Sequence, residues 1–302
     1  MSTFGAPQPT SYFSEPSDTL DPQLFEGRTL KSWVRQGILA LLNDHLSKTY
    51  KHPETWSTAW LAGSGVSYQW AASRNPGDLD CLVGVNMIQF RKANPEYMGL
   101  SDGEIAEDIN EGFRDDLQPL TSNWDGYELT FYVNRGAADI RAIKPYAAYN
   151  LTFQEWTVAP DPNVAPPVHP DWEASVASDT ALAHKIVTRY TQALQDVTQS
   201  HNGAVRRNAE SRLSAAMQQG NALYNEIHLN RSQAFSPGGE GYADFNNYRW
   251  QAGKREGTVQ ALRQLHTHSQ SLQHSTEAAT YGIELPDANT LIRRAALYGR
   301  AQ

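Results

Sequence analysis

The sequence is poor in cysteine and has no long apolar run. Cys81 is the only cysteine among 302 residues, which excludes an internal disulfide and any zinc site made of several cysteines. We therefore expect a protein of the reducing cytoplasm. No stretch approaches the ~18 consecutive apolar residues of a membrane-spanning helix. Residues 1–18 lack the basic start and apolar core of a signal peptide, so neither membrane insertion nor secretion is expected.

Basic residues are also scarce in the first part of the chain. Residues 1–180 hold 12 Lys and Arg against 24 Asp and Glu, a balance of −12, whereas residues 181–302 hold 13 against 9, a balance of +4. An acidic first part suits cation binding, and a mildly basic second part could meet a partner that carries phosphate. Ordinary variation in surface composition explains the same numbers, because +4 is far below the dense basic stripe typical of nucleic-acid binding.

The hydrophobic pattern divides the chain into two parts. Eight Trp, 14 Tyr and nine Phe can fill a core, which excludes a wholly disordered chain. Residues 1–22 are rich in Ser, Thr and Pro and predict a flexible tail, and residues 159–171 hold five prolines, which predicts a stiff connector. We predict the fold class α/β (α+β), with a small mixed sheet and flanking helices at 23–158 and an all-helical domain at 172–302.

Apolar spacing locates the individual elements of both parts. A period of 3.6 residues predicts helices, and alternation or a short apolar run predicts strands. We expect strands at 58–62, 78–85 and 127–134, with a fourth short strand or hairpin arm at 139–143. We expect helices at 30–46, at 99–120 with a Ser101–Glu104 capping box, at 176–197, 205–227 and 245–262, and from 286 onward.

The stretch from Leu61 to Val85 carries the chemically informative residues. Its first strand ends in Gly63-Ser64-Gly65, a turn that we expect to feed a short helix up to residue 72. Such a turn lets a phosphate approach the backbone, and a helix start offers unpaired N–H groups to an anion. By itself, a Gly-Ser-Gly sequence is as typical of an ordinary turn.

Two carboxylates follow at the start of the next strand, at Asp78 and Asp80. Residues two apart on a strand point to the same face, and adjacent carboxylates repel each other unless a cation or a proton bridges them. Their hard oxygen atoms suit Mg²⁺ or Mn²⁺. The alternative is a solvated strand end. Cys81 points the other way and is expected in the core.

Gly-Ser followed after about a dozen residues by Asp-x-Asp resembles the nucleotidyltransferase superfamily related to DNA polymerase beta. The chain is similar in particular to the predicted nucleotidyltransferases of bacteriophages, over residues 20 to 260. The further matching features are Leu20-Asp21-Pro22-Gln23-Leu24, Trp70, the strand 127–133, the segment from Tyr149 to Trp156 with Pro160, and Gly239-Glu240.

The resemblance implies a third carboxylate on a neighbouring strand. Glu128 is the first choice, and it would complete a metal site with Asp78 and Asp80. Members of this branch often carry a second acid two residues later, where this chain has Thr130. Glu128 and Thr130 are offset by about 6–7 Å along the strand, which leaves open how near Glu128 comes to the metal. Asp139 is the fallback.

The resemblance also implies a reaction. An acceptor hydroxyl would attack the α-phosphate of a nucleoside triphosphate in line, with pyrophosphate leaving and with Mg²⁺ or Mn²⁺ neutralising charge. Gly63, Ser64 and Gly65 would contact the triphosphate, and we expect Lys185 and Arg189 to add positive charge unless they only form a solvated helix face. The sequence does not name the acceptor; an RNA end, a protein and a small molecule are all open.

Three hypotheses follow for function. The first is an active nucleotidyltransferase, and the second is a relative that kept the fold and binds nucleotide, or serves a structural role, without turnover. Thr130 in place of an acid favours the second. The third is a module that binds a nucleic-acid end through the helical domain, which the more basic second part of the chain supports weakly.

Overall fold

The computed structural model describes residues 4–70, 77–134, 139–163 and 166–282, together with 290, 291 and 295. The described chain divides into two compact units. Of the described residues, the helical unit comprises those within 4–10, 167–234 and 243–282, and the sheet unit comprises those within 11–166 and 235–242 together with 290, 291 and 295. The chain passes from sheet unit to helical unit inside the proline-rich segment 159–171. Residues 235–242, which we assigned to the helical domain, belong to the sheet unit, and residues 4–10, which we expected in a flexible tail, belong to the helical unit.

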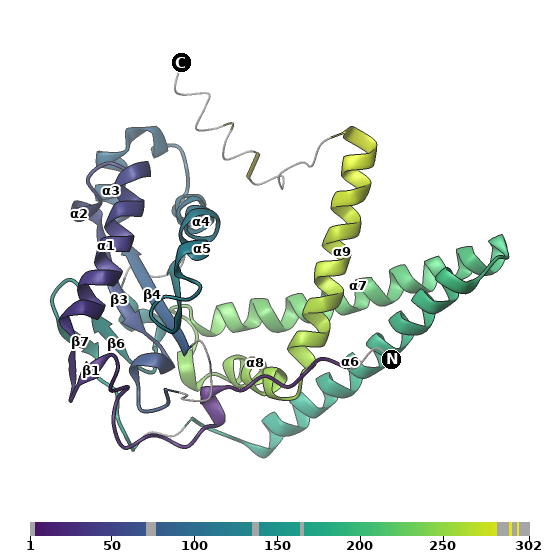
Figure 1. Ribbon diagram of the computed structural model, residues 1–302, viewed down its shortest axis with the longest axis horizontal. Coiled ribbons are helices and arrows are strands. Elements are labelled where there is room, and N and C mark those ends of the chain that lie inside the picture. Colours follow the sequence, from purple (N-terminus) through teal and green to yellow (C-terminus); the bar gives the residue numbers. More distant parts are fainter. Residues whose placement is uncertain are drawn as a thin grey trace. The chain divides into compact units, whose positions relative to one another are not determined.

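The sheet unit is built on a five-stranded mixed sheet, so the predicted α+β class is confirmed. The strands are β3 (Ser57–Ala62), β4 (Gly77–Val85), β5 (Tyr127–Val133), β6 (Ala148–Asn150) and β7 (Glu155–Val158), in the order β5-β4-β3-β6-β7 (Figure 1). The β4–β5 pair is parallel, and the other three pairs are antiparallel. A separate hairpin joins β1 (Phe25–Glu26) and β2 (Thr29–Leu30).

A layer of helices covers one face of this sheet. They are α1 (Ser32–Thr49), α2 (Pro53–Trp56), α3 (Met87–Ala93), α4 (Asp102–Gly112), a π-helical turn η4 (Phe113–Leu117) and α5 (Gln118–Thr121). Short 3₁₀ turns are η1 (Ser11–Phe13), η2 (Ser64–Val66), η3 (Pro95–Tyr97), η5 (Ile140–Ile143) and η6 (Gly241–Ala243). The Ser101–Glu104 capping box of α4 is confirmed. The apolar stripes of α1 and α4 pack on the alternate strand residues Leu61, Leu79, Cys81, Leu129 and Phe131.

On the opposite face of the sheet, strand residues pack against the turn η5. Trp60, Leu82 and Ile143 belong to a second, smaller apolar cluster there. The expected strand at 139–143 is wrong, because this segment forms η5. The Asp139 side chain accepts a hydrogen bond from the backbone N–H of Arg141 at 2.9 Å, and such a local bond favours a turn over a sheet ladder.

Residues 4–22 carry buried side chains where we expected a flexible tail. Tyr12 and Leu20 are only 2% and 3% exposed within the sheet unit. In the helical unit, Phe4 stacks on His184 with ring centroids 3.5 Å apart. The segment is rich in Ser and Pro, but its few large apolar residues are sufficient to fix it by burial.

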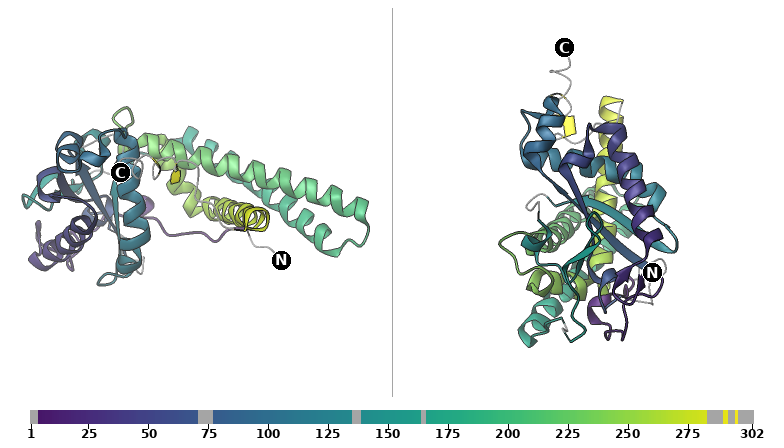
Figure 2. Two further views of the ribbon diagram at one scale, coloured as in Figure 1. Left: turned by 90° about the horizontal axis from the view of Figure 1, so that it is seen from above. Right: turned by 90° about the vertical axis from the view of Figure 1, so that its left-hand side faces the viewer.

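The described residues of the helical unit form four α-helices. They are α6 (Pro170–Gln199), α7 (Gly203–Ala234), α8 (Phe245–Arg255) and α9 (Thr258–Tyr281). Helices α6 and α7 run side by side as a long hairpin (Figure 2). The core contains Ala183, Ile186, Leu223, Ile227, Trp250, Val259, Leu262 and Leu265.

The single helix expected at 245–262 is wrong, because the chain ends α8 at Arg255 and begins α9 at Thr258. Gly257 between them has φ of +80°, a left-handed conformation that suits glycine and ends helices. The helix expected from residue 286 falls almost entirely outside the described residues. No helix among the described residues is both long and apolar enough to cross a membrane.

Candidate active site

The two aspartates of the Asp-x-Asp sequence lie on one face of β4, next to Glu128 on β5. In the parallel β4–β5 pair, Asp78 is the partner of Glu128 and Asp80 is the partner of Thr130. Partners on adjacent strands are about 4.8 Å apart and point to the same face of a sheet. All four side chains are half-buried, whereas Leu79 between the aspartates is fully buried. The face away from the helical layer therefore carries three carboxylates at one end.

The Gly63–Gly65 turn lies directly against these aspartates. Antiparallel pairing places Ala62, the last residue of β3, opposite Asp80. Gly63 has φ of +86°, and a Cβ atom there would lie 3.2 Å from Oδ2 of Asp80. A Cβ atom on Gly65 would lie 2.5 Å from the backbone oxygen of Asp78. Both glycines thus permit a close approach that a larger residue would prevent.

The helix expected after this turn does not form in the described part of it. Residues 64–66 make the single 3₁₀ turn η2, and residues 71 and 72 lie outside the described residues. Ser67 holds the turn, because its N–H and its hydroxyl both donate to the carbonyl of Ser64, at 3.0 and 2.9 Å. Any phosphate contact at Ser64 would come from its hydroxyl and the turn's N–H groups, without help from a long helix dipole.

A buried hydrogen bond fixes the start of β5 beside the carboxylates. The hydroxyl of Tyr127 donates to Asp21 at 2.7 Å, and Asp21 is only 4% exposed. Burial, followed by the hydrogen bond to Asp21, raises the pKa of Tyr127 above its usual range, so the phenol stays protonated as a donor. Sequence reasoning cited Asp21 only as part of a resemblance and missed this contact.

The core side of β4 contributes no nucleophile to this site. Cys81 is fully buried between the sheet and the helices. Burial raises the pKa of its thiol well above the usual range, so the reactive thiolate is suppressed. The structural role expected for Cys81 agrees with this location.

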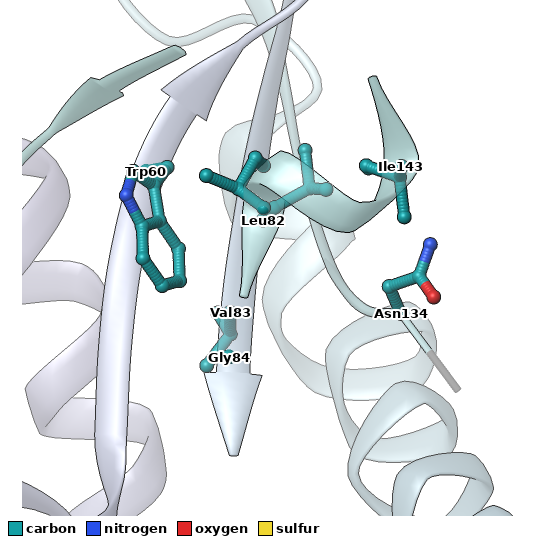
Figure 3. A pocket seen from close by; sticks show the side chains of 7 residues that line it. Trp60, Leu82, Val83, Gly84, Asn134 and Ile143 are labelled. Carbon is teal, nitrogen blue, oxygen red and sulfur yellow. The ribbon is translucent and has the colours of Figure 1, made fainter. Parts of the chain in front are cut away.

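A small apolar pocket lies farther along the same strands. Leu82 lies between Trp60 of β3 and Ile143 of η5 in the close-up (Figure 3). The pocket has a cavity volume of about 10 Å³, far below the ~300–1,000 Å³ typical of ligand sites. It is therefore too small for a nucleotide, and the half-buried carboxylates on the same face are the better candidate.

Of the other expected site residues, Asp139 lies outside the strands, and Lys185 and Arg189 lie in the helical unit. Asp139 precedes η5 and forms an exposed ion pair with Arg141 at 2.9 Å, so it does not share a strand with the other acids. Lys185 and Arg189 are exposed on α6 of the helical unit. Trp70 is half-buried, and its indole N–H donates to the carbonyl of Thr19 at 2.9 Å.

The three carboxylates do not by themselves form a complete metal site. Among the residues that the structure describes, no group of three or more His, Cys, Asp or Glu side chains lies close enough to hold a metal ion. Mg²⁺, however, is commonly bound by one or two carboxylates, with substrate phosphates and waters as the other ligands. The donor set of Asp78 and Asp80, with Glu128 on the adjacent strand, fits that chemistry. Glu128 as a direct ligand stays a prediction.

Comparisons with known proteins identify no family for this chain. A scan against protein-family models, a search of curated proteins and a search of solved structures each found no match. The function has to be inferred from the residues of the chain itself.

Proposed function

We propose that the chain is a metal-dependent nucleotidyltransferase, which moves a nucleoside monophosphate from a nucleoside triphosphate to an acceptor hydroxyl and releases pyrophosphate. One arrangement carries the proposal: Asp78 and Asp80 share a sheet face, Glu128 is the strand partner of Asp78, and Gly63 directly follows Ala62, the strand partner of Asp80. The glycine turn and the carboxylates therefore lie together where β3 ends and β4 and β5 begin.

Each part of this site has a role in the proposed reaction. The Ser64 hydroxyl and the N–H groups of its turn would bind phosphate oxygens, and the small glycines would let the triphosphate approach the backbone. Asp78, Asp80 and Glu128 would hold divalent cations, which supply charge neutralisation for the triphosphate and lower the pKa of the attacking hydroxyl. Orientation and charge neutralisation account for most of the rate in such transfers.

A non-catalytic nucleotide-binding protein is the second candidate, and two observations favour it. Thr130 stands opposite Asp80, where an acid would extend the carboxylate set. No three-ligand metal group is present among the described residues. A protein of this kind would bind nucleotide at the same site without releasing pyrophosphate.

The test measures binding and turnover separately. The intact chain is titrated with each of the four NTPs in Mg²⁺ or Mn²⁺ by calorimetry, and pyrophosphate release is then followed with labelled NTP and a cell extract as the source of acceptor. We expect binding that needs the cation, and a loss of at least about 10-fold in affinity in Asp78→Asn and Asp80→Asn, because a lost charged contact costs about 1.5–3 kcal/mol. Asp44→Asn, at an exposed position of α1, is the matched control.

The outcomes separate the candidates. Binding without turnover favours the non-catalytic protein, and the absence of NTP binding in both cations overturns both. Glu128→Gln should abolish pyrophosphate release and keep the fold, whereas Asp139→Asn should leave release unchanged. The opposite result would assign the third carboxylate to Asp139.

A further inference from the structure

Three helices of the helical unit bring cationic and aromatic side chains together around one tryptophan. The guanidinium carbons of Arg231 on α7 and Arg263 on α9 lie 5.3 and 5.9 Å from the ring centroid of Trp250 on α8. The ring of His228 lies 5.5 Å from that of Trp250. Helix α9 crosses α7 (Figure 1), so residues far apart in sequence meet here.

A tyrosine and a second histidine extend this group. The ring of Tyr224 lies 5.8 Å from His228 and 5.0 Å from His266. His228 and Arg263 are exposed, whereas Tyr224, Arg231 and His266 are half-buried. We call Tyr224, His228, Arg231, Trp250, Arg263 and His266 the cationic cluster.

Acidic residues are rare in the segments that form the cationic cluster. Residues 221–234 contain one acid, Glu226, and residues 258–273 contain none. Glu226 is already engaged, because it pairs with Arg249 at 2.8 Å. Like charges held together raise the free energy of the patch, and an anion in contact with them would relieve that repulsion.

We propose that the cationic cluster binds the phosphate backbone of a single strand of nucleic acid. Arg231 and Arg263 would contact phosphate oxygens through their guanidinium groups, and His228 and His266 would add donors when protonated. The partly exposed ring of Tyr224 offers a stacking surface beside these cations, a combination typical of single-strand binding. The proposal is independent of nucleotidyl transfer, because it uses no metal and no residue of the sheet unit.

The cationic cluster suits nucleic acid better than a membrane surface. Membrane-surface helices insert large apolar side chains beside their cations. The apolar centre of this cluster, Trp250, is only 5% exposed and is covered by the two arginines. The accessible groups are therefore the cationic and polar ones, which match a phosphodiester strand.

The pKa of His228 reports directly on anion binding at this site. Partial burial of the imidazole, followed by the charges of Arg231, Arg263 and His266, lowers the pKa of His228. Tyr224 and Arg231 from α7, Trp250 from α8, and Arg263 and His266 from α9 are the groups that face it. A bound phosphate would oppose these charges and raise the pKa of His228.

The test uses fluorescein-labelled 12-nucleotide oligo-U and oligo-dT with the intact chain in EDTA, followed by anisotropy across a salt series. We expect Arg231→Gln/Arg263→Gln to weaken binding by about 10-fold or more at 0.1 M salt. Losing two phosphate contacts should also reduce the slope of log K against log salt by about 1.4. Arg231→Lys/Arg263→Lys should keep that slope, and His228 should titrate at higher pH in the bound state by NMR.

Arg206→Gln/Arg207→Gln is the matched control. It removes the same charge from exposed positions on α7, about 36 Å along the helix from residue 231, and should leave affinity unchanged. Thermal unfolding checks that both Gln variants fold. Absence of oligonucleotide binding, an equal loss in the control, or binding to anionic lipid vesicles in place of the oligonucleotides would overturn the proposal.

Discussion

Both units bury large apolar side chains, and the helical unit also brings its long helices together at small residues. The sheet unit buries large aromatic rings between sheet and helices, including Trp56, Phe90 and Phe113. The helical unit packs its long helices through small residues, with Ala183 fully buried and Gly220 directly against Leu265. The sheet unit should therefore be most sensitive to truncation, and the helical unit to enlargement.

The two units also place charge differently. The sheet unit gathers carboxylates at one end of a sheet face, next to a glycine turn. The helical unit gathers cations where three helices meet. If both proposals hold, the first unit binds a nucleotide through a cation, and the second binds phosphate directly.

The largest expected effect is the truncation of Trp56. Its ring is 2% exposed, meets Phe90 edge-on at 4.9 Å and donates its N–H to the carbonyl of Lys51 at 2.9 Å. Trp56→Ala should lower the free energy of unfolding by about 3–5 kcal/mol, because it removes buried contacts and leaves a cavity. Urea denaturation followed by circular dichroism measures this.

Trp33→Ala is the matched control for this truncation. Trp33 is 41% exposed and touches Trp124, so its loss should cost about 0.5–1.5 kcal/mol, the value of an aromatic pair. Similar losses for both variants would contradict the view that ring burial stabilises the sheet unit.

The elements of the candidate site were predictable because strong local patterns mark them. Strand β4 combines a buried apolar alternation with its two acids, and the capping box of α4 involves residues only three positions apart. The short strands β6 and β7, with three and four residues, were not predicted, because segments this short show no clear periodicity. Their places in the sheet depend on the pairing of β6 with β3 and of β7 with β6.

Contacts between distant segments explain the remaining differences. Gly257 breaks a continuous apolar stripe where the backbone of Gly5 comes close: a Cβ atom on Gly257 would lie 2.0 Å from the carbonyl oxygen of Gly5. The cationic cluster was missed for a similar reason. His228 with Arg231, and Arg263 with His266, are each three residues apart on one helix, but only the crossing of α7 and α9 joins the two pairs.

Enlargement of Gly220 should have an intermediate effect and tests the helical unit. A Cβ atom on Gly220 would lie 2.9 Å from a Leu265 methyl group and 3.6 Å from Ile186. Gly220→Leu should lower the free energy of unfolding by about 1–3 kcal/mol through overpacking, although leucine has a higher helix propensity than glycine. Ala222→Leu, at an exposed position on the same helix, should change stability by less than about 0.5 kcal/mol. Equal effects would show that α7 tolerates bulk on both faces.

The smallest expected effect is the response of one histidine in each unit to pH. Burial lowers the pKa of His45 below its ordinary value of 6.5, with Asp116 opposing the shift, and burial with the nearby arginines lowers the pKa of His228. The unfolded chain binds these protons near pH 6.5, whereas the folded chain resists them. Stability should therefore be complete above pH 6.5 and decline as pH falls below it, and His45→Gln should flatten this decline in urea denaturation.

Salt distinguishes the surroundings of the two histidines. Screening weakens the arginine charges near His228, so the pKa of His228 should rise when NaCl is increased from 0.05 to about 0.5 M. Near His45, the largest charge contribution comes from Asp116 and raises the pKa, so screening should lower it slightly. NMR titration of the imidazole protons measures both. A shift of the same sign at both histidines would remove the charge contrast between the units, and the cationic cluster would lose its electrostatic basis.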